Sequence, residues 1–258
     1  MTGPLLLPDR GVLAVTGPDT TRLLQDLVTN DLSKAVPGTP IYTALLTAQG
    51  KYLFDFILWP VEDGFLFDMD KAAIAPLIKK LTLYRLRAQV AFEDRSDTLM
   101  VEIGGDGAPD PRHADLPQRR VVEAGPPGDP APYHECRIRL GVPETGDFTS
   151  DGTFWLETGA ERLNGVNFKK GCYVGQEQTA RMKHRGTVKK GYRPFRVTQG
   201  AASVGDEIEG ARALGPVTSV AGDVALGFVR LGPFADSKSF NTENATLEPL
   251  PLDTGGLP

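Results

Sequence analysis

A cysteine in a glycine-flanked loop carries the most distinctive chemistry in this sequence. Cys172 stands between Gly171 and Gly175 and closely follows Lys169 and Lys170. Glycine allows backbone angles and close approaches that other residues resist, and ammonium groups near a thiol favour its nucleophilic thiolate form. We therefore interpret Cys172 as a reactive cysteine, which could serve as a nucleophile, a redox partner or a transient contact of a metal cluster.

The residues after this loop are typical of a short helix. Residues 176–183 are mostly good helix formers, and Gly186 is a natural stop. Glu177 lies in the expected first turn and basic residues lie in the last, which is the arrangement that the helix dipole favours. We expect Cys172 to precede a helix N-terminus, a position that also favours a thiolate.

The other cysteine and the three histidines predict neither disulfides nor a zinc site. Cys136 lies in an expected helix and is interpreted as a small buried hydrophobe. Two cysteines suit a reducing compartment, and the scattered histidines lack the spacing of metal ligands. A permanently bound iron–sulfur cluster would normally need more thiolates. No resident metal is therefore expected.

The sequence also bears on the location of the protein. The sequence shows no secretory signal and no apolar run near the roughly 20 residues of a membrane span, which favours a cytoplasmic protein without a membrane partner.

The positive charge is concentrated in one segment. Residues 161–196 hold ten basic and two acidic residues, a net charge of +8. Because the whole chain has a net charge of −5, the remaining residues carry −13. Such segregation favours an anionic ligand or an acidic partner, although a solvated basic face would give the same pattern.

The elements that must position these residues form two groups. Residues 12–16, 41–47, 52–59, 65–69, 89–92 and 98–103 alternate or are rich in β-branched and aromatic side chains, and predict strands. One helix is expected from Thr20 through Leu27 and Val28, ended by residues 29–31. Another, capped by Asp70, is expected through Leu81. This order predicts an α+β region with mainly antiparallel sheets.

The second half predicts loops, a short helix and a small barrel. Residues 104–115 and 125–132 are rich in Gly, Pro and charge, and 134–140 can form a helix. Residues 192–197, 204–208, 213–220 and 225–229 alternate with Gly-rich turns, as in a small all-β barrel. We place a domain boundary near Gly191 and expect an irregular tail beyond Leu231.

The residues around Cys172 also resemble a family signature. Residues 170–177, Lys-Gly-Cys-Tyr-Val-Gly-Gln-Glu, are similar to the K-G-C-x-x-G-Q-E signature of the YgfZ family. These are folate-binding proteins that look like the glycine-cleavage aminomethyltransferase and support iron–sulfur enzymes. Residues 17–19, 28–31, 49–51, 156–157 and 165–168 extend the resemblance over most of the chain, and Asp55 is similar to that of the family's mitochondrial branch, which assists late iron–sulfur cluster assembly.

The resemblance implies a fold and its division into domains. It implies a folate-binding, aminomethyltransferase-like α+β fold with antiparallel sheets and packed helices, followed by a small C-terminal β-barrel. Residues 1–190 would form the folate-binding region as two interleaved α+β subdomains. Residues 191–258 would form the barrel domain with its irregular tail.

The resemblance also implies a cofactor and a set of site residues. Tetrahydrofolate or a one-carbon derivative would occupy a central cavity. Glu157 would hold the amino-pyrimidine edge of the pterin because a carboxylate accepts two N–H bonds side by side, and Asp55 would accept from a folate amine. Arg181 would reach the anionic glutamate tail or pair with Glu177. Cys172, the catalytic candidate, would lie exposed at the cavity rim among the other signature residues: Lys170, Gly171, Tyr173, Gly175, Gln176 and Glu177.

Two departures from the aminomethyltransferases separate function hypotheses. Phe54 stands before Asp55, where those enzymes usually have a second acid, and those enzymes lack the cysteine of the signature. Both favour a tetrahydrofolate-binding protein that supports assembly, maturation or repair of iron–sulfur proteins, with assembly proteins or client enzymes as partners. The alternatives are a folate-dependent aminomethyltransferase, methyltransferase or demethylase, and a non-enzymatic docking protein. Whether the chain turns over a substrate is left open. Nucleic acid is not expected, because the basic segment shows no recognised binding motif.

Overall fold

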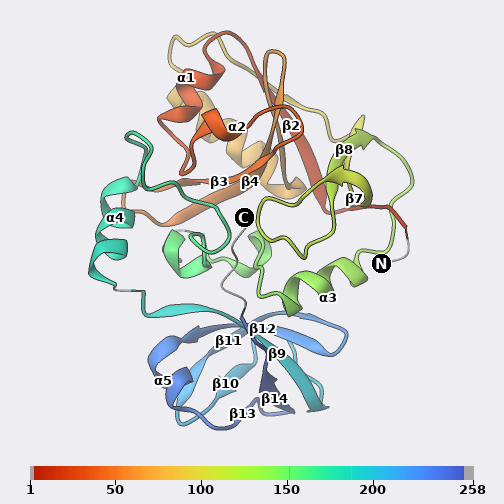
Figure 1. Cartoon of the computed structure of the whole chain (residues 1–258), viewed down its shortest axis with the longest axis vertical. Helices are drawn as coiled ribbons and strands as arrows, with labels where there is room; N and C mark the ends of the chain where they lie inside the picture. The colour runs from red at the N-terminus through yellow and green to blue at the C-terminus, as the bar shows by residue number, and fades with distance from the viewer. Residues whose placement is uncertain (1–2, 151, 187, 253–258) are drawn as a thin grey trace.

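A five-stranded antiparallel sheet forms the N-terminal part of the protein. The computed structural model describes residues 3–150, 152–186 and 188–252. The strand order is β3-β4-β5-β2-β6, and the bounds are β2 (Arg10–Thr16), β3 (Ile41–Leu46), β4 (Tyr52–Val61), β5 (Gly64–Asp70) and β6 (Ala91–Asp94). One face packs on α1 (Thr20–Gln25) and α2 (Ile74–Arg85), where Leu24, Ile74 and Leu77 meet the buried strand residues (Figure 1).

The opposite face of this sheet carries polar side chains toward the middle of the molecule. Strand residues alternate between faces, and the register pairs Asp55 with Ala44, Tyr42 with Ile57, and Ile57 with Asp68. Asp55, Tyr42 and Asp68 therefore project from the same face, opposite α1 and α2.

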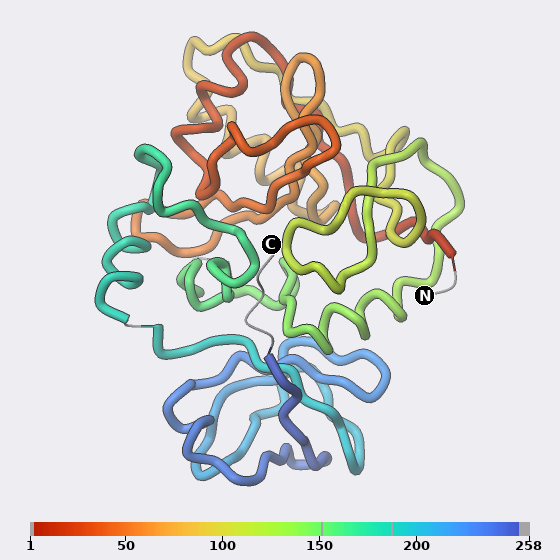
Figure 2. The backbone as a smooth tube through the Cα atoms, in the orientation of Figure 1, coloured from red at the N-terminus to blue at the C-terminus, as the bar shows by residue number. Residues whose placement is uncertain are grey.

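A second, smaller sheet pairs an N-terminal strand with two strands from the middle of the chain, and two helices follow in the sequence. Its strands are β1 (Leu5–Leu6), β7 (Leu99–Ala108) and β8 (Arg119–Glu123), in the order β1-β7-β8, and the helices are α3 (Ala131–Arg139) and α4 (Gln176–Arg185). In Figure 2 the green segment that includes α3 lies between the N-terminal sheet and the blue barrel. The expected loop at 104–115 is partly wrong, because β7 continues to Ala108 and bends around glycines with positive φ at Gly104 and Gly105.

The C-terminal part is a closed six-stranded barrel in the order β10-β11-β12-β9-β14-β13. Its elements are β9 (Lys190–Gly200), β10 (Glu207–Glu209), β11 (Ala213–Ala221), β12 (Val224–Arg230), α5 (Leu231–Asp236), β13 (Phe240–Asn241) and β14 (Ala245–Pro249). Phe195, Ile208 and Val229 belong to its apolar core.

The prediction of an irregular tail beyond Leu231 is wrong for the described residues. β13 pairs with β10, and β14 pairs with β9, so these two short strands close the barrel. Ala245 and Leu247 are buried while the residues between and after them are exposed. This alternation is too short to stand out in a polar, Pro- and Gly-containing stretch. Residues 253–258 of the expected tail lie outside the described residues. No helix in the described part of the chain is both long and apolar enough to cross a membrane.

Candidate functional site

The cysteine of the signature is exposed on a loop that leads directly into α4. Cys172 is a free thiol in a segment without regular structure, and α4 begins four residues later at Gln176. Gly175 precedes the helix with φ of +85°, and a Cβ there would lie 2.6 Å from the carbonyl oxygen of Thr47. Only glycine fits this contact between the loop and the β3–β4 hairpin. The helix ends, as predicted, at Gly186 in the left-handed conformation.

Lys170 is buried, and its ammonium group is bound to backbone carbonyls. Its Nζ donates to the carbonyl oxygens of Gln25, Val28 and Asn30 at 2.7, 2.6 and 3.0 Å. Burial lowers the pKa of this amine to about 8. The sequence pattern suggested that Lys169 and Lys170 favour the Cys172 thiolate; instead, all three N–H bonds of Lys170 are directed at carbonyls.

The remaining signature residues divide between anchors and exposed positions. Tyr173 is buried, and its ring centroid lies 5.2 Å from the Lys170 Nζ. Gln176 begins α4, and Glu177 lies exposed in its first turn. The loop therefore presents Cys172 to solvent between two buried neighbours in the sequence, Lys170 and Tyr173.

Asp55 is buried in the interior of β4. It is 2% exposed, and its carboxylate accepts hydrogen bonds from the hydroxyls of Tyr42, Tyr52 and Thr145 at 3.0, 3.1 and 2.8 Å. Burial raises its pKa, although the positive charge of Arg10 and the hydrogen bonds from Thr145 and Tyr42 act in the opposite direction. The structure thus places Asp55 among packed side chains, not at the solvent-exposed end of a strand.

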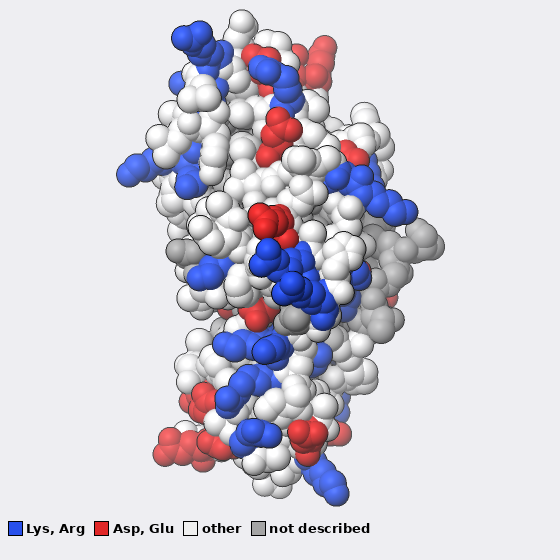
Figure 3. All heavy atoms as spheres, turned by 90° about the vertical axis from the view of Figure 1, so that its left-hand side faces the viewer, with Lys and Arg blue, Asp and Glu red and all other residues white. Residues whose placement is uncertain are grey.

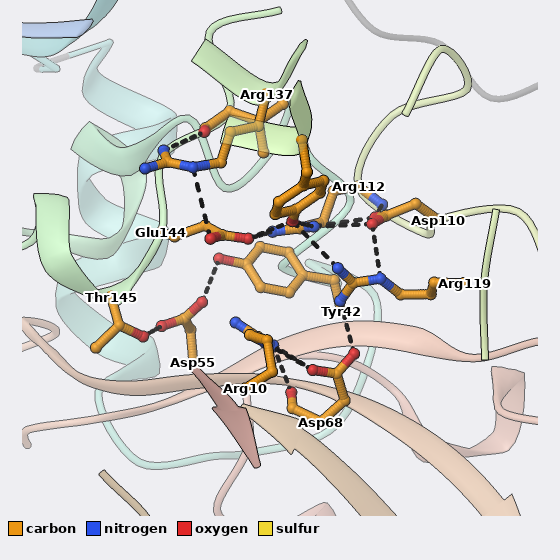
Figure 4. A network of polar contacts seen from close by, with 12 residues as sticks. Arg10, Tyr42, Asp55, Asp68, Asp110, Arg112, Arg119, Arg137, Glu144 and Thr145 are labelled. Carbon is orange, nitrogen blue, oxygen red and sulfur yellow. Dashed lines mark hydrogen bonds and ion pairs between the residues drawn. The ribbon is translucent and has the colours of Figure 1, made fainter. Parts of the chain in front are cut away.

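A buried network of charged groups adjoins Asp55 (Figure 4). Arg10 and Arg119 both contact the Asp68 carboxylate, at 2.6 Å each, and Arg112 bridges Asp110 and Glu144 at 2.8 Å each. Every one of these side chains is less than 10% exposed. The network joins β2, β5 and β8 to the loops that hold Asp110 and Glu144.

Glu144 is the acid whose titration the network changes most clearly. Burial alone would raise its pKa, but the guanidinium groups of Arg112 and Arg137 hold that pKa well below its usual range. Arg137 also contacts Asp147 at 2.9 Å and donates to the Ser219 hydroxyl of β11 at 3.0 Å. The network therefore continues from the N-terminal sheet into the barrel.

This network was not predicted from the sequence. The sequence signal is a charged residue inside an otherwise apolar strand, as at Asp68 in β5, or at the start of one, as at Arg10 in β2. Such residues must be paired or hydrogen-bonded when buried, but the sequence does not identify the partners.

Glu157 lies in a different place, beside the barrel. It belongs to the short 3-10 helix Trp155–Thr158, and its Oε2 accepts from the backbone N–H of Phe154 at 3.1 Å. It lines a cavity of about 190 Å³ together with Lys190, Tyr192 and Arg193, and burial raises its pKa. A hollow of about 600 Å³ on the α4 side shares four lining residues with this cavity: Leu156, Gly159, Arg162 and Val188. The two hollows therefore adjoin, and we refer to them together as the Glu157 groove.

Arg181 lies on the exposed side of α4. Its guanidinium pairs with Glu177 at 3.2 Å, one helical turn away, as the sequence allowed. The three residues assigned to folate therefore have three different surroundings. Asp55 adjoins the buried network, Glu157 lines the groove, and Arg181 takes part in a surface ion pair.

The basic segment forms an exposed face around α4 and the start of the barrel (Figure 3). Lys183 pairs with Glu161, and Arg196 lies 3.7 Å from Asp223. Lys190 and Arg193 lie over the rings of Phe228 and Phe234, each at 5.6 Å. Within the described residues, no group of three or more His, Cys, Asp or Glu side chains is arranged to hold a metal ion.

Comparison with known proteins shows relatives along most of the chain. It is 33% identical over 224 residues to an IBA57 homologue, a mitochondrial iron–sulfur cluster assembly factor of Neurospora crassa, which covers 71% of this chain and 51% of that protein. It is 34% identical over 231 residues to human IBA57, covering 74% of this chain and 65% of that protein. The matched part thus spans about half to two thirds of the length of these curated relatives.

Two further matches concern the barrel and the fold. Residues 189–254 match the family model of the CAF17 C-terminal beta-barrel domain. The structure superimposes on aminomethyltransferase T of the glycine cleavage system from Bartonella henselae with a TM-score of 0.77 and 14% identity, covering 98% of this chain and 86% of that one. The predicted aminomethyltransferase-like fold with a C-terminal barrel is confirmed.

The predicted cytoplasmic location is wrong. The relatives are named mitochondrial proteins, which points to the mitochondrion. The prediction rested on a missing secretory signal and on few cysteines, and neither feature distinguishes the cytoplasm from the interior of an organelle. The similarity to IBA57 proteins, the barrel match and the aminomethyltransferase-like fold together show that this chain belongs to the YgfZ/IBA57 family.

Proposed function

We propose that this protein supports the assembly, maturation or repair of iron–sulfur proteins, with Cys172 as the group that contacts a cluster or a client. The observation that carries the proposal is a free thiol exposed on an anchored loop. The relatives are named iron–sulfur cluster assembly factors, which supports the same role. Iron–sulfur clusters are held by several thiolates. Cys172 can supply one of these ligands while a partner protein supplies the others. The partners are therefore assembly proteins or client enzymes.

The second cysteine provides a matched control for this proposal. Cys136 is partly buried on α3, and burial raises the pKa of its thiol. Its reactive thiolate form is therefore disfavoured, and its sulfur is less accessible than that of the exposed Cys172. We expect Cys172→Ala to abolish support of [4Fe–4S] enzymes in a strain that depends on this protein, and Cys136→Ala to retain it. Enzyme activities under oxidative stress measure the effect. Full activity in the Cys172→Ala strain would contradict the proposal.

We also propose that the Glu157 groove binds tetrahydrofolate or a one-carbon derivative. A half-buried carboxylate suits the N–H groups of a pterin edge, and Lys190 and Arg193 at the same cavity suit an anionic tail. The larger hollow, of about 600 Å³, lies within the range of about 300–1,000 Å³ that small-molecule sites occupy. These residues fit the ligand; when bound, it would carry a one-carbon unit. Asp55 and Arg181 lie in other surroundings, so this proposal rests on Glu157.

Calorimetry with tetrahydrofolate tests the folate proposal. We expect Glu157→Gln to weaken binding by about 1.5–3 kcal/mol, because it removes a charged hydrogen-bond acceptor. Arg181→Ala serves as the control on the adjacent helix and should bind as the wild type does. Equal affinity of the wild type and Glu157→Gln would remove the groove as the site.

Enzymatic aminomethyl or methyl transfer and a purely non-enzymatic docking role remain alternatives. The match to aminomethyltransferase T concerns the fold alone. A product formed from tetrahydrofolate and a methylamine donor would favour the enzyme. Salt-sensitive binding of an acidic partner to the basic face, without folate affinity, would favour docking.

A further inference from the structure

Each of the three N–H donors of the buried Lys170 ammonium has a backbone carbonyl oxygen as its acceptor. A lysine ammonium carries three N–H bonds, and Nζ lies within 3.0 Å of three backbone carbonyl oxygens. Gln25, Val28 and Asn30 supply these oxygens from the segment in which α1 ends. We call this arrangement the carbonyl cage. The cage satisfies all donors of a side chain that is 7% exposed, as a buried polar group requires.

The segment that supplies the carbonyls is itself fixed. The backbone N–H of Thr29 donates to the carbonyl of Ala44 in β3, and Thr29 in turn accepts from the N–H of Asn167, both at 3.0 Å. The Asn30 side chain donates to the carbonyls of Tyr42 and Asn164 at 2.9 and 2.7 Å. The cage is therefore a rigid part of the sheet edge, to which Lys170 ties the signature loop.

The loop is also held after Cys172. Tyr173 is buried beneath the Lys170 ammonium, and Gly175 is in tight contact with the β3–β4 hairpin. Cys172 lies between the cage contact of Lys170 and these two later attachments, and it is exposed. Its position is thus determined by contacts that its own side chain does not make.

We infer that Lys170 is a positioning residue for Cys172, acting through the three hydrogen bonds of the carbonyl cage and not through its charge. This inference rests on the proposed role of Cys172. A guanidinium keeps the positive charge but presents its donors in a planar fork, so it cannot reproduce the threefold geometry of an ammonium. A methionine has a similar length but no donor, and it leaves three carbonyls without their partner.

Comparison of Lys170→Arg with Lys170→Met separates geometry from charge. We expect amide hydrogen exchange in residues 25–30 and 168–174 to increase about tenfold or more in both variants, while the barrel amides keep wild-type protection. The pH profile of Cys172 alkylation by iodoacetamide, with Cys136 as the internal reference, should keep its position in both. Support of [4Fe–4S] enzymes should fall in both.

Two results would overturn the inference. One is wild-type exchange in Lys170→Arg, which would show that a charge suffices. The other is an alkylation profile that moves in Lys170→Met but not in Lys170→Arg, which would show electrostatic activation of the thiol. If Lys170→Met does not fold, Lys170→Arg alone decides through its exchange. Increased loop exchange together with full enzyme support in Cys172→Ala would uphold the cage and refute the proposed function.

Discussion

The buried network and the basic face differ in the surroundings of their charged side chains, which are buried and paired in the network and exposed to solvent on the face. In the network, Arg112 is 1% exposed and makes short contacts with two carboxylates and with the hydroxyl of Tyr133 at 2.7 Å (Figure 4). On the basic face, the Arg181–Glu177 pair leaves half of the arginine side chain and most of the glutamate in solvent. Both regions are rich in arginine and lie in the same molecule.

The difference determines which region can hold the fold and which can meet a partner. A buried charge that loses its partner is strongly destabilising, so each member of the network depends on the others. An exposed pair contributes little to stability and is screened by salt. The network therefore joins the sheet, α3 and the barrel, whereas the face around α4 and Cys172 is free to change partners.

Removing an arginine from the network should have the largest effect. We expect Arg112→Met to destabilise the protein by about 3–5 kcal/mol, because Asp110 and Glu144 lose a buried counter-charge. Urea unfolding followed by circular dichroism measures the change. A loss below about 1 kcal/mol, the usual value for a surface pair, would remove the contrast between the two regions.

Acid should weaken the network at a pH set by Glu144. Its folded-state pKa lies below the unfolded value of 4.5, so its ionised form adds stability that is present above that value. This contribution is lost as the pH falls below about 4.5 and the unfolded state takes up the proton first. We expect Glu144→Gln to be less stable than the wild type at pH 7 and to lose less stability between pH 5 and pH 3.

Two comparisons make the acid experiment specific. Glu177→Gln removes an exposed acid from the basic face, and its stability should follow the wild-type pH curve. If Glu144→Gln follows that curve as well, the low pKa of Glu144 does not contribute to folding stability. Thermal unfolding at matched pH values gives both curves.

The smallest effect is expected on the basic face. Arg181→Ala breaks an exposed i,i+4 pair, which is worth about 0.3–0.5 kcal/mol. We expect the stability difference from the wild type to disappear in high salt. A loss above about 1 kcal/mol that salt does not reduce would show that Arg181 belongs to a structural network after all.

Much of the local structure could be predicted from the sequence. The cap at Asp70, the helix that ends at Gly186 and the first four barrel strands, β9 to β12, follow from periodicity and from turn or cap residues. The α1 prediction extended too far, because Leu27 and Val28 are buried but lie after the helix ends at Gln25. Burial alone does not distinguish a helical position from a packed loop.

The sequence by itself determined the identity and neighbours of the signature cysteine. It predicted Cys172 in a loop before a helix, with a glycine at Gly175 where the backbone needs one, because these features depend on adjacent residues. The exposure of Cys172 expected from the family resemblance agrees with its place in the structure.

Only the tertiary structure decided what the surrounding charges do. It places Lys170 in a cage made by residues 25–30, and Asp55 beside a network that includes residues 10, 68, 112 and 144. Glu157 and Arg181 are likewise separated into a groove and an exposed helix face. The physical reason is that a charge acquires its role from its partners and its burial, and both depend on residues that are distant in the chain.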